Sequence, residues 1–147
     1  MTRDHKPDDP EEFKVIKAAG GRVDSYRDSQ GNKVGPERVW MKNEDIPGLA
    51  MSRSFGDQIA CRCGVNAIPE IDELRLTPND KFIILASDGV WEFLPNQTVA
   101  DIVHPFYLKK NAEGAAENLV RAAFKEWKNQ ENVIDDITCI VIFLDIK

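Results

Sequence analysis

The sequence predicts a mixed α and β fold, and two observations support that prediction. Two short, strongly apolar runs, KFIILAS at 81–87 and ITCIVIFL at 137–144, are typical of buried β-strands. Between them lie two stretches with helical periodicity, one starting at Asn96 and a longer one from Ala112 to Lys128. Hydrophobic residues make up 42% and charged residues 30% of the 147 residues, so we expect one folded globular domain.

The first element expected is a short helix that begins after Asp9. Asp9 can cap this helix, Pro10 suits its first position, and Glu12 stands where a capping box needs an acidic residue. The apolar stripe of the helix and the glycines that should end it are Phe13, Ile16, Ala19, Gly20 and Gly21.

The next segment is polar and contains glycine, which indicates a hairpin or a mobile flap over 24–37. A short strand is expected at 38–42, and a second strand, more loosely patterned, at 71–76. Residues 78–80 supply a turn before the first apolar run.

The continuous apolar character of 81–87 predicts a strand that is buried on both faces. The helix that begins at Asn96 should end at Pro105, which cannot continue its hydrogen bonding. In the longer helix, apolar residues recur at core-facing spacing, which we interpret as packing rather than as a binding groove. These residues are Ala116, Leu119, Val120, Ala123, Phe124 and Trp127.

Charge and cysteine content exclude several classes of protein. The net charge of −6 provides no field that would attract nucleic acid. No apolar stretch approaches the length of a membrane span, and the polar start of the chain is unlike a signal peptide. The odd number of cysteines, three, fits a reducing compartment, so we expect a cytoplasmic or nuclear protein.

Acidic residues flank the two apolar runs at opposite ends: Asp88 follows the first, whereas Asp135 and Asp136 precede the second. If the two strands are antiparallel neighbours, these residues lie at the same edge of one sheet. Ionised carboxylates that share such an edge repel each other unless a cation neutralises them, and Mg²⁺ and Mn²⁺ prefer such oxygen ligands. Two such ions can activate a water molecule for attack on phosphorus.

Spacing alone leaves a plainer interpretation open, in which Asp88 only begins a turn and 135–136 is the solvated start of a strand. A nucleotide hydrolase is disfavoured because the chain has no G-x-x-x-x-G-K-[ST] loop. A phosphatase of the haloacid dehalogenase type would need a nucleophilic aspartate two residues before Asp88, where this sequence has Ala86.

Five separated strings occur in one order: RDHKPDDPEE with AGGRV, GLAMSRSFGD, IPEIDEL, FIILASDGVWEFL and DDITCIVI. Together they resemble the later motifs of type-2C (PPM) metal-dependent protein serine/threonine phosphatases, over essentially the whole chain. The resemblance implies an α+β fold, a layered α-β-β-α sandwich of antiparallel sheets flanked by helices. Residues 1–147 would form the C-terminal part of one such domain, with a flap-like segment at 24–47.

The resemblance also implies phosphoprotein substrates, two or three Mg²⁺ or Mn²⁺ ions in the complete domain, and roles for individual residues. Asp88 and Asp135 match aspartates that coordinate metal, whereas Asp136 is the adjacent member of the pair. Asp4 matches an aspartate associated with a third, more weakly held metal. Arg53 matches the family pattern in GLAMSRSFGD, where we expect mainly structural support and, as a second role, contact with substrate.

The family's earlier motifs are missing, namely its first glutamate-aspartate and arginine, and the D-G-H-G-G string with a bridging ligand and the proposed acid histidine. We therefore expect hydrolysis of phosphoserine and phosphothreonine by metal-activated water in the complete domain and no activity in this chain alone. The alternative is a non-catalytic regulatory or binding fragment. The missing half would also supply strands to both sheets, so exposed strand edges favour self-association.

Overall fold

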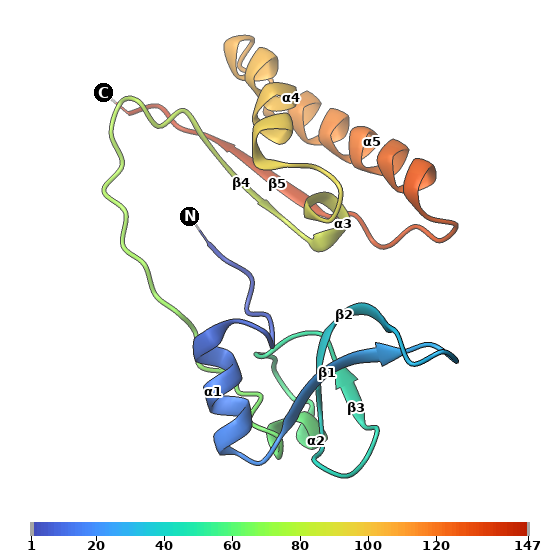
Figure 1. Ribbon diagram of the computed structural model, residues 1–147. Coiled ribbons are helices and arrows are strands. Elements are labelled where there is room, and N and C mark those ends of the chain that lie inside the picture. Colours follow the sequence, from blue (N-terminus) through green and yellow to red (C-terminus); the bar gives the residue numbers. More distant parts are fainter. Residues whose placement is uncertain (1, 147) are drawn as a thin grey trace. The chain divides into compact units, whose positions relative to one another are not determined.

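The computed structural model describes residues 2–146, which form two compact units. Unit 1 extends to Glu73 and unit 2 begins at Leu74 (Figure 1). Each unit has its own antiparallel sheet and its own apolar core.

Unit 1 combines a three-stranded antiparallel sheet, in the order β1-β2-β3, with two helices. The predicted hairpin is confirmed: β1 and β2 pair from Arg22 opposite Trp40 to Arg27 opposite Lys33. Its turn is closed by Asp28, whose carboxylate accepts from the backbone N–H groups of Gln30 and Asn32. The elements are α1 (Pro10–Ala18), β1 (Arg22–Arg27), β2 (Lys33–Trp40), β3 (Pro47–Leu49) and α2 (Gln58–Cys61).

Helix α1 begins as predicted, because the carboxylate of Asp9 accepts from the backbone N–H groups of the next turn. The predicted capping box is wrong. The N–H of Asp9 donates to the carbonyl of Lys6 at 3.1 Å, so the cap needs no second acceptor. Glu12 is instead 3% exposed and bonds Arg53. Of the predicted apolar stripe only Ile16 is buried, and Phe13 is exposed.

Unit 2 packs two helices against one face of a two-stranded antiparallel sheet (Figure 1). Strands β4 and β5 pair from Phe82 opposite Phe143 to Ala86 opposite Cys139. The elements are β4 (Phe82–Ala86), α3 (Asp88–Trp91), α4 (Asn96–Leu108), α5 (Ala112–Gln130) and β5 (Cys139–Phe143). The buried core between helices and sheet consists of Val90, Leu94, Val99, Val103, Ala115, Leu119 and Ala123.

The prediction that the first apolar run is buried on both faces is wrong for this chain. One face of the sheet packs on α4 and α5, whereas the other face is open: Leu85 is 54%, Ile140 55% and Ile142 41% exposed. A continuous apolar run is typical of a strand covered on both sides. The described residues supply a cover for only one side.

The expected strand at 71–76 is absent; these residues are exposed and span the boundary between the two units. Helix α4 does not end at Pro105 but continues to Leu108. Proline removes one hydrogen bond and crowds the carbonyl of the preceding turn, but Phe106, which follows it, packs on the core and keeps the helix going.

Helix α5 matches its predicted position, but its buried stripe is Ala115, Leu119 and Ala123. Phe124, predicted to face the core, is 43% exposed and lies under the ammonium group of Lys128.

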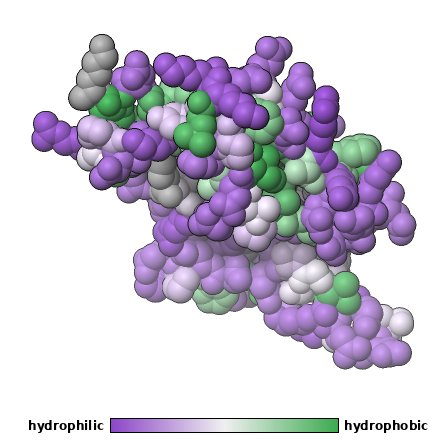
Figure 2. Space-filling view, turned by 90° about the horizontal axis from the view of Figure 1, so that it is seen from above, coloured by the Kyte–Doolittle hydropathy of each residue, from purple (hydrophilic) through white to green (hydrophobic). Residues whose placement is uncertain are grey.

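The face seen in Figure 2 is mainly hydrophilic, with apolar residues gathered in a few patches. Within the described residues, none of the helices combines the length and the apolar character needed to cross a bilayer.

Candidate functional site

Asp88 lies in the first turn of α3, directly after β4. The residue before it, Ser87, joins this turn to the start of β5. The backbone N–H of Ser87 donates to the carbonyl of Thr138 at 3.0 Å, and its hydroxyl donates to the carbonyl of Asp136 at 3.1 Å. The same hydroxyl accepts from the N–H of Thr138 at 3.1 Å. These bonds extend the pairing of β4 and β5 beyond the end of the strands.

Gly89 brings the turn still closer to the acidic pair. A Cβ atom added at Gly89 would lie 2.3 Å from the carbonyl oxygen of Asp136 and 3.0 Å from the Cα of Ile137. The close approach of two backbones therefore requires glycine here. The predicted antiparallel pairing is thus confirmed, and the backbone segments that carry Asp88 and Asp135 lie at the same edge of the sheet.

Trp127, at the end of α5, holds the turn from the other side. Its indole Nε1–H donates to the carbonyl of Gly89 at 2.7 Å, and its ring packs edge-to-face on Phe93 with centroids 4.8 Å apart. Sequence reasoning assigned Trp127 to the core stripe and missed this contact. The sequence offered one clue: a tryptophan on a core-facing stripe needs an acceptor for its indole N–H.

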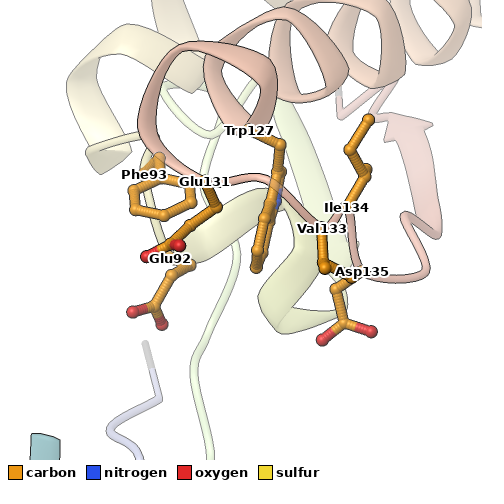
Figure 3. Close-up of a pocket in the computed structure, with 7 residues that line it drawn as sticks. All are labelled: Glu92, Phe93, Trp127, Glu131, Val133, Ile134 and Asp135. Atoms are coloured by element: carbon orange, nitrogen blue, oxygen red, sulfur yellow. The ribbon is translucent and has the colours of Figure 1, made fainter.

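Asp135 lines a pocket of about 340 Å³ between the α3 turn and the end of α5. Glu92 follows α3, whereas Glu131 and Asp135 belong to the segment after α5, and Figure 3 shows the carboxylates of Glu92 and Glu131 on one side of the Trp127 indole and that of Asp135 on the other. The backbone N–H of Asp136 donates to the carboxylate of Asp135 at 2.8 Å.

Within residues 2–146, Asp88, Asp135 and Asp136 form no ion pair with lysine or arginine. The donors present, carboxylate oxygens on adjacent segments, are of the type that Mg²⁺ and Mn²⁺ prefer, and such ions keep several waters and need only one or two protein carboxylates. No cluster of three or more acidic, histidine or cysteine side chains that could hold a metal occurs in the described residues. The residues therefore fit part of a metal site.

The other two predicted site residues belong to unit 1. Asp4 is exposed, with its carboxylate 3.8 Å from the ammonium nitrogen of Lys6. Arg53 donates to the carboxylate of Glu12, to the carbonyl of Ile68 at 2.8 Å and to Glu70 at 3.2 Å. These contacts suit the structural role expected for Arg53. Its contact with substrate and the metal role of Asp4 stay predictions.

Arg53 belongs to a charged network that sequence reasoning missed. Hydrogen bonding from Arg53 lowers the pKa of Glu12, and that of Arg53 is raised in turn. Arg3 bonds both Asp9, at 2.6 Å, and Glu70, at 2.9 Å. The hydrogen bond from Arg3 is the main reason why the pKa of Glu70 falls to about 2. The network ties the start of the chain and α1 to the segment around residues 53–70.

Comparison with known protein families identifies the family of this chain. Residues 1–132 match the sequence model of the family described as protein phosphatase 2C. The chain belongs to the protein phosphatase 2C family. The predicted fold class, α+β with antiparallel sheets and flanking helices, is confirmed, and the chain forms a portion of the complete fold of this family.

Plant relatives align with this phosphatase 2C chain over its whole length. It is 43% identical to "Probable protein phosphatase 2C 64" of Oryza sativa subsp. japonica over 151 aligned residues, and 42% identical to "Probable protein phosphatase 2C 52" of Arabidopsis thaliana. All of the chain is covered in both comparisons, but only 33% and 30% of the relatives. The chain thus spans about a third of the length of these proteins.

A solved structure agrees with this assignment. The serine-threonine phosphatase 2C from Toxoplasma gondii superposes on 99% of the chain with a TM-score of 0.83 at 25% identity, and 46% of that protein is covered.

Proposed function

We propose that this chain is the C-terminal part of a single phosphatase domain that hydrolyses phosphoserine and phosphothreonine in proteins. The observation that supports this most directly is the Asp88–Gly89 turn, which packs against the segment of Asp135 and Asp136 at the end of two antiparallel strands. Family membership and the phosphatase names of the relatives point to the same chemistry.

In this proposal Asp88 and Asp135 hold Mg²⁺ or Mn²⁺, and Asp4 serves a third, more weakly held ion. Such ions activate water for direct attack on phosphorus and offset charge on the phosphoryl oxygens. The other residues of the edge orient the two carboxylates: Ser87 ties the turn to β5, and Trp127 fixes it from α5. Arg53 remains a candidate for substrate contact.

The chain alone is proposed to be inactive because it provides only part of a metal site. A second candidate, a non-catalytic regulatory or binding fragment, is favoured by the same lack of a third metal-ligating side chain among the described residues. The two differ in what happens when the chain is extended at its N-terminus to the length of its relatives. A truncated enzyme then gains Mn²⁺-dependent hydrolysis of a phosphothreonine peptide, whereas a regulatory fragment does not.

Metal binding is tested by titrating Mn²⁺ into the chain in a calorimeter. Asp88→Asn keeps the size of the side chain and removes its charge, so we expect it to abolish binding at this edge. Asp101→Asn, an exposed position on α4, is the matched control and should leave binding unchanged. Equal binding by the Asp88→Asn variant and the unmodified chain would remove the metal assignment.

We also propose that chains associate through the β4–β5 sheet. Within the described residues each of its strands has one unpaired edge, and its open face exposes Leu85, Ile140 and Ile142. Exposed edges beside an apolar face favour pairing with another chain.

A further inference from the structure

The pocket that Asp135 lines has a composition that metal binding does not explain. We name it the acidic-aromatic pocket; it is lined by Glu92, Phe93, Trp127, Glu131, Val133, Ile134 and Asp135. Its volume of about 340 Å³ is at the lower end of the range typical of pockets that bind a small group. All of its lining residues belong to unit 2.

The aromatic part of the pocket is held in one orientation. The hydrogen bond from Nε1 of Trp127 to the carbonyl of Gly89 fixes the indole, and Phe93 packs against it at an interplanar angle of 77°. Figure 3 shows the indole standing between Glu131 on one side and Asp135 on the other. The face of an indole attracts a cation more strongly than any other side-chain ring does.

The acidic part of the pocket consists of Glu92, Glu131 and Asp135. In the described part of the chain, Glu92, Glu131 and Asp135 take part in no ion pair. The lysine of the last turn of α5, Lys128, lies over the ring of Phe124, 4.7 Å from its centroid. Three carboxylates therefore line the same pocket as a fixed indole, and no ion pair within residues 2–146 neutralises them.

We propose that the acidic-aromatic pocket binds the arginine or lysine side chain of a phosphoprotein substrate, close in sequence to the phosphorylated residue. The inference rests on the proposed function, because Asp135 belongs both to the pocket and to the predicted metal site. A basic side chain in the pocket thus places its neighbours in the substrate next to the metal-binding edge. The charge complements the pocket: carboxylates attract the cationic group while the indole contacts it through its face.

The test measures binding without metal and without turnover. The ¹⁵N-labelled chain, in buffer with a chelator, is titrated with blocked phosphothreonine peptides that carry one arginine at one to four positions from the phosphorylated residue. Each peptide is matched by one with neutral citrulline in place of arginine. The indole resonance of Trp127, assigned by substituting Trp40→Phe and Trp91→Phe, reports on the pocket by nuclear magnetic resonance.

We expect at least one arginine peptide to shift the Trp127 resonance and its citrulline counterpart to bind several-fold more weakly. The double variant Glu92→Gln/Glu131→Gln should weaken arginine-peptide binding about tenfold, the effect of losing two partly exposed ion pairs. Glu113→Gln/Glu117→Gln, on the exposed side of α5, removes the same charge and should keep the affinity.

Equal binding of arginine and citrulline peptides, or equal weakening by both double variants, would overturn the proposal. So would an identical Trp127 shift with diamagnetic Mg²⁺ alone that abolishes the peptide response, because the pocket would then be a metal site. Since no metal is present in the peptide titration, these outcomes are distinct from a failure of the Asp88→Asn experiment.

Discussion

Gly89→Ala tests whether the close approach of two backbone segments builds the acidic edge. Gly89 is helical rather than left-handed, so alanine has no backbone conformational penalty there. The only obstacle is contact. The new Cβ would lie 2.3 Å from the carbonyl oxygen of Asp136, whereas ordinary contacts begin at 3.4 Å. The turn and the acidic pair must therefore separate by about 1 Å.

The expected cost follows from the contacts that this separation disturbs. Overpacking of this kind costs about 1–3 kcal/mol. A 1 Å shift also breaks the hydrogen bond from the Ser87 hydroxyl to Asp136, now 3.1 Å long, and strains the bond from Trp127 to Gly89. Each such bond contributes about 1 kcal/mol. We expect a loss of about 2–4 kcal/mol in the free energy of unfolding, together with weaker binding of Mn²⁺.

The measurement is urea unfolding followed by circular dichroism, with Mn²⁺ titration of the folded variant. Gly114→Ala is the control for metal binding, because its Cβ would displace the side-chain amide of Asn111, which caps the other end of α5. Its free energy of unfolding should fall by about 0.5–2 kcal/mol, the cost of a lost helix cap, whereas its binding of Mn²⁺ should stay unchanged. If Gly89→Ala unfolds at the same urea concentration as the unmodified chain and binds Mn²⁺ equally well, backbone packing does not position the two aspartates.

Three further predictions follow from other contacts. Glu12→Ala removes the buried partner of the Arg53 guanidinium, which keeps its second partner, Glu70. The free energy of unfolding in urea should fall by about 2–3 kcal/mol. An unchanged value would show that the pair is dispensable. The pKa of Glu70, about 2 against an ordinary 4.5, means that its contribution to stability is complete above pH 4.5 and disappears as the pH falls toward 2. Arg3→Ala should move this pKa back toward 4.5 in a nuclear magnetic resonance titration, and no movement would exclude Arg3 as its cause. Ile140→Lys/Ile142→Lys should reduce self-association in sedimentation equilibrium, and an unchanged mass at equal concentration would exclude the open sheet face as the contact.

Local signals in the sequence predicted the elements well where one interaction determines each of them. Asp9 and Pro10 mark the start of α1 because capping and the fixed φ of proline act within a single turn. The polar segment at 24–37 predicted a hairpin, since Asp28 and Asn32 close its turn locally. The expected end of α4 at Pro105 failed because packing of the following turn on the core outweighs the loss of one hydrogen bond.

The candidate site was predictable only as far as strand pairing determines it. The order of apolar runs and aspartates predicted that the segments of Asp88 and Asp135 meet at one edge, and the register confirms that they do. The contacts that fix this edge join residues far apart in the sequence. Trp127 and Gly89 are 38 positions apart, and no periodicity in α5 distinguishes a core tryptophan from one that donates to a distant carbonyl.

The failed prediction about the β4–β5 sheet is itself informative. Strand β5 alternates in burial, and Ile140 and Ile142 on its open face are as apolar as the residues that pack on the helices. A sheet with one face in water normally carries polar residues on that face. The apolar residues of the open face therefore suit a sheet that a second layer covers. The match to a phosphatase more than twice as long as this chain is consistent with that requirement, because a longer chain can supply such a layer.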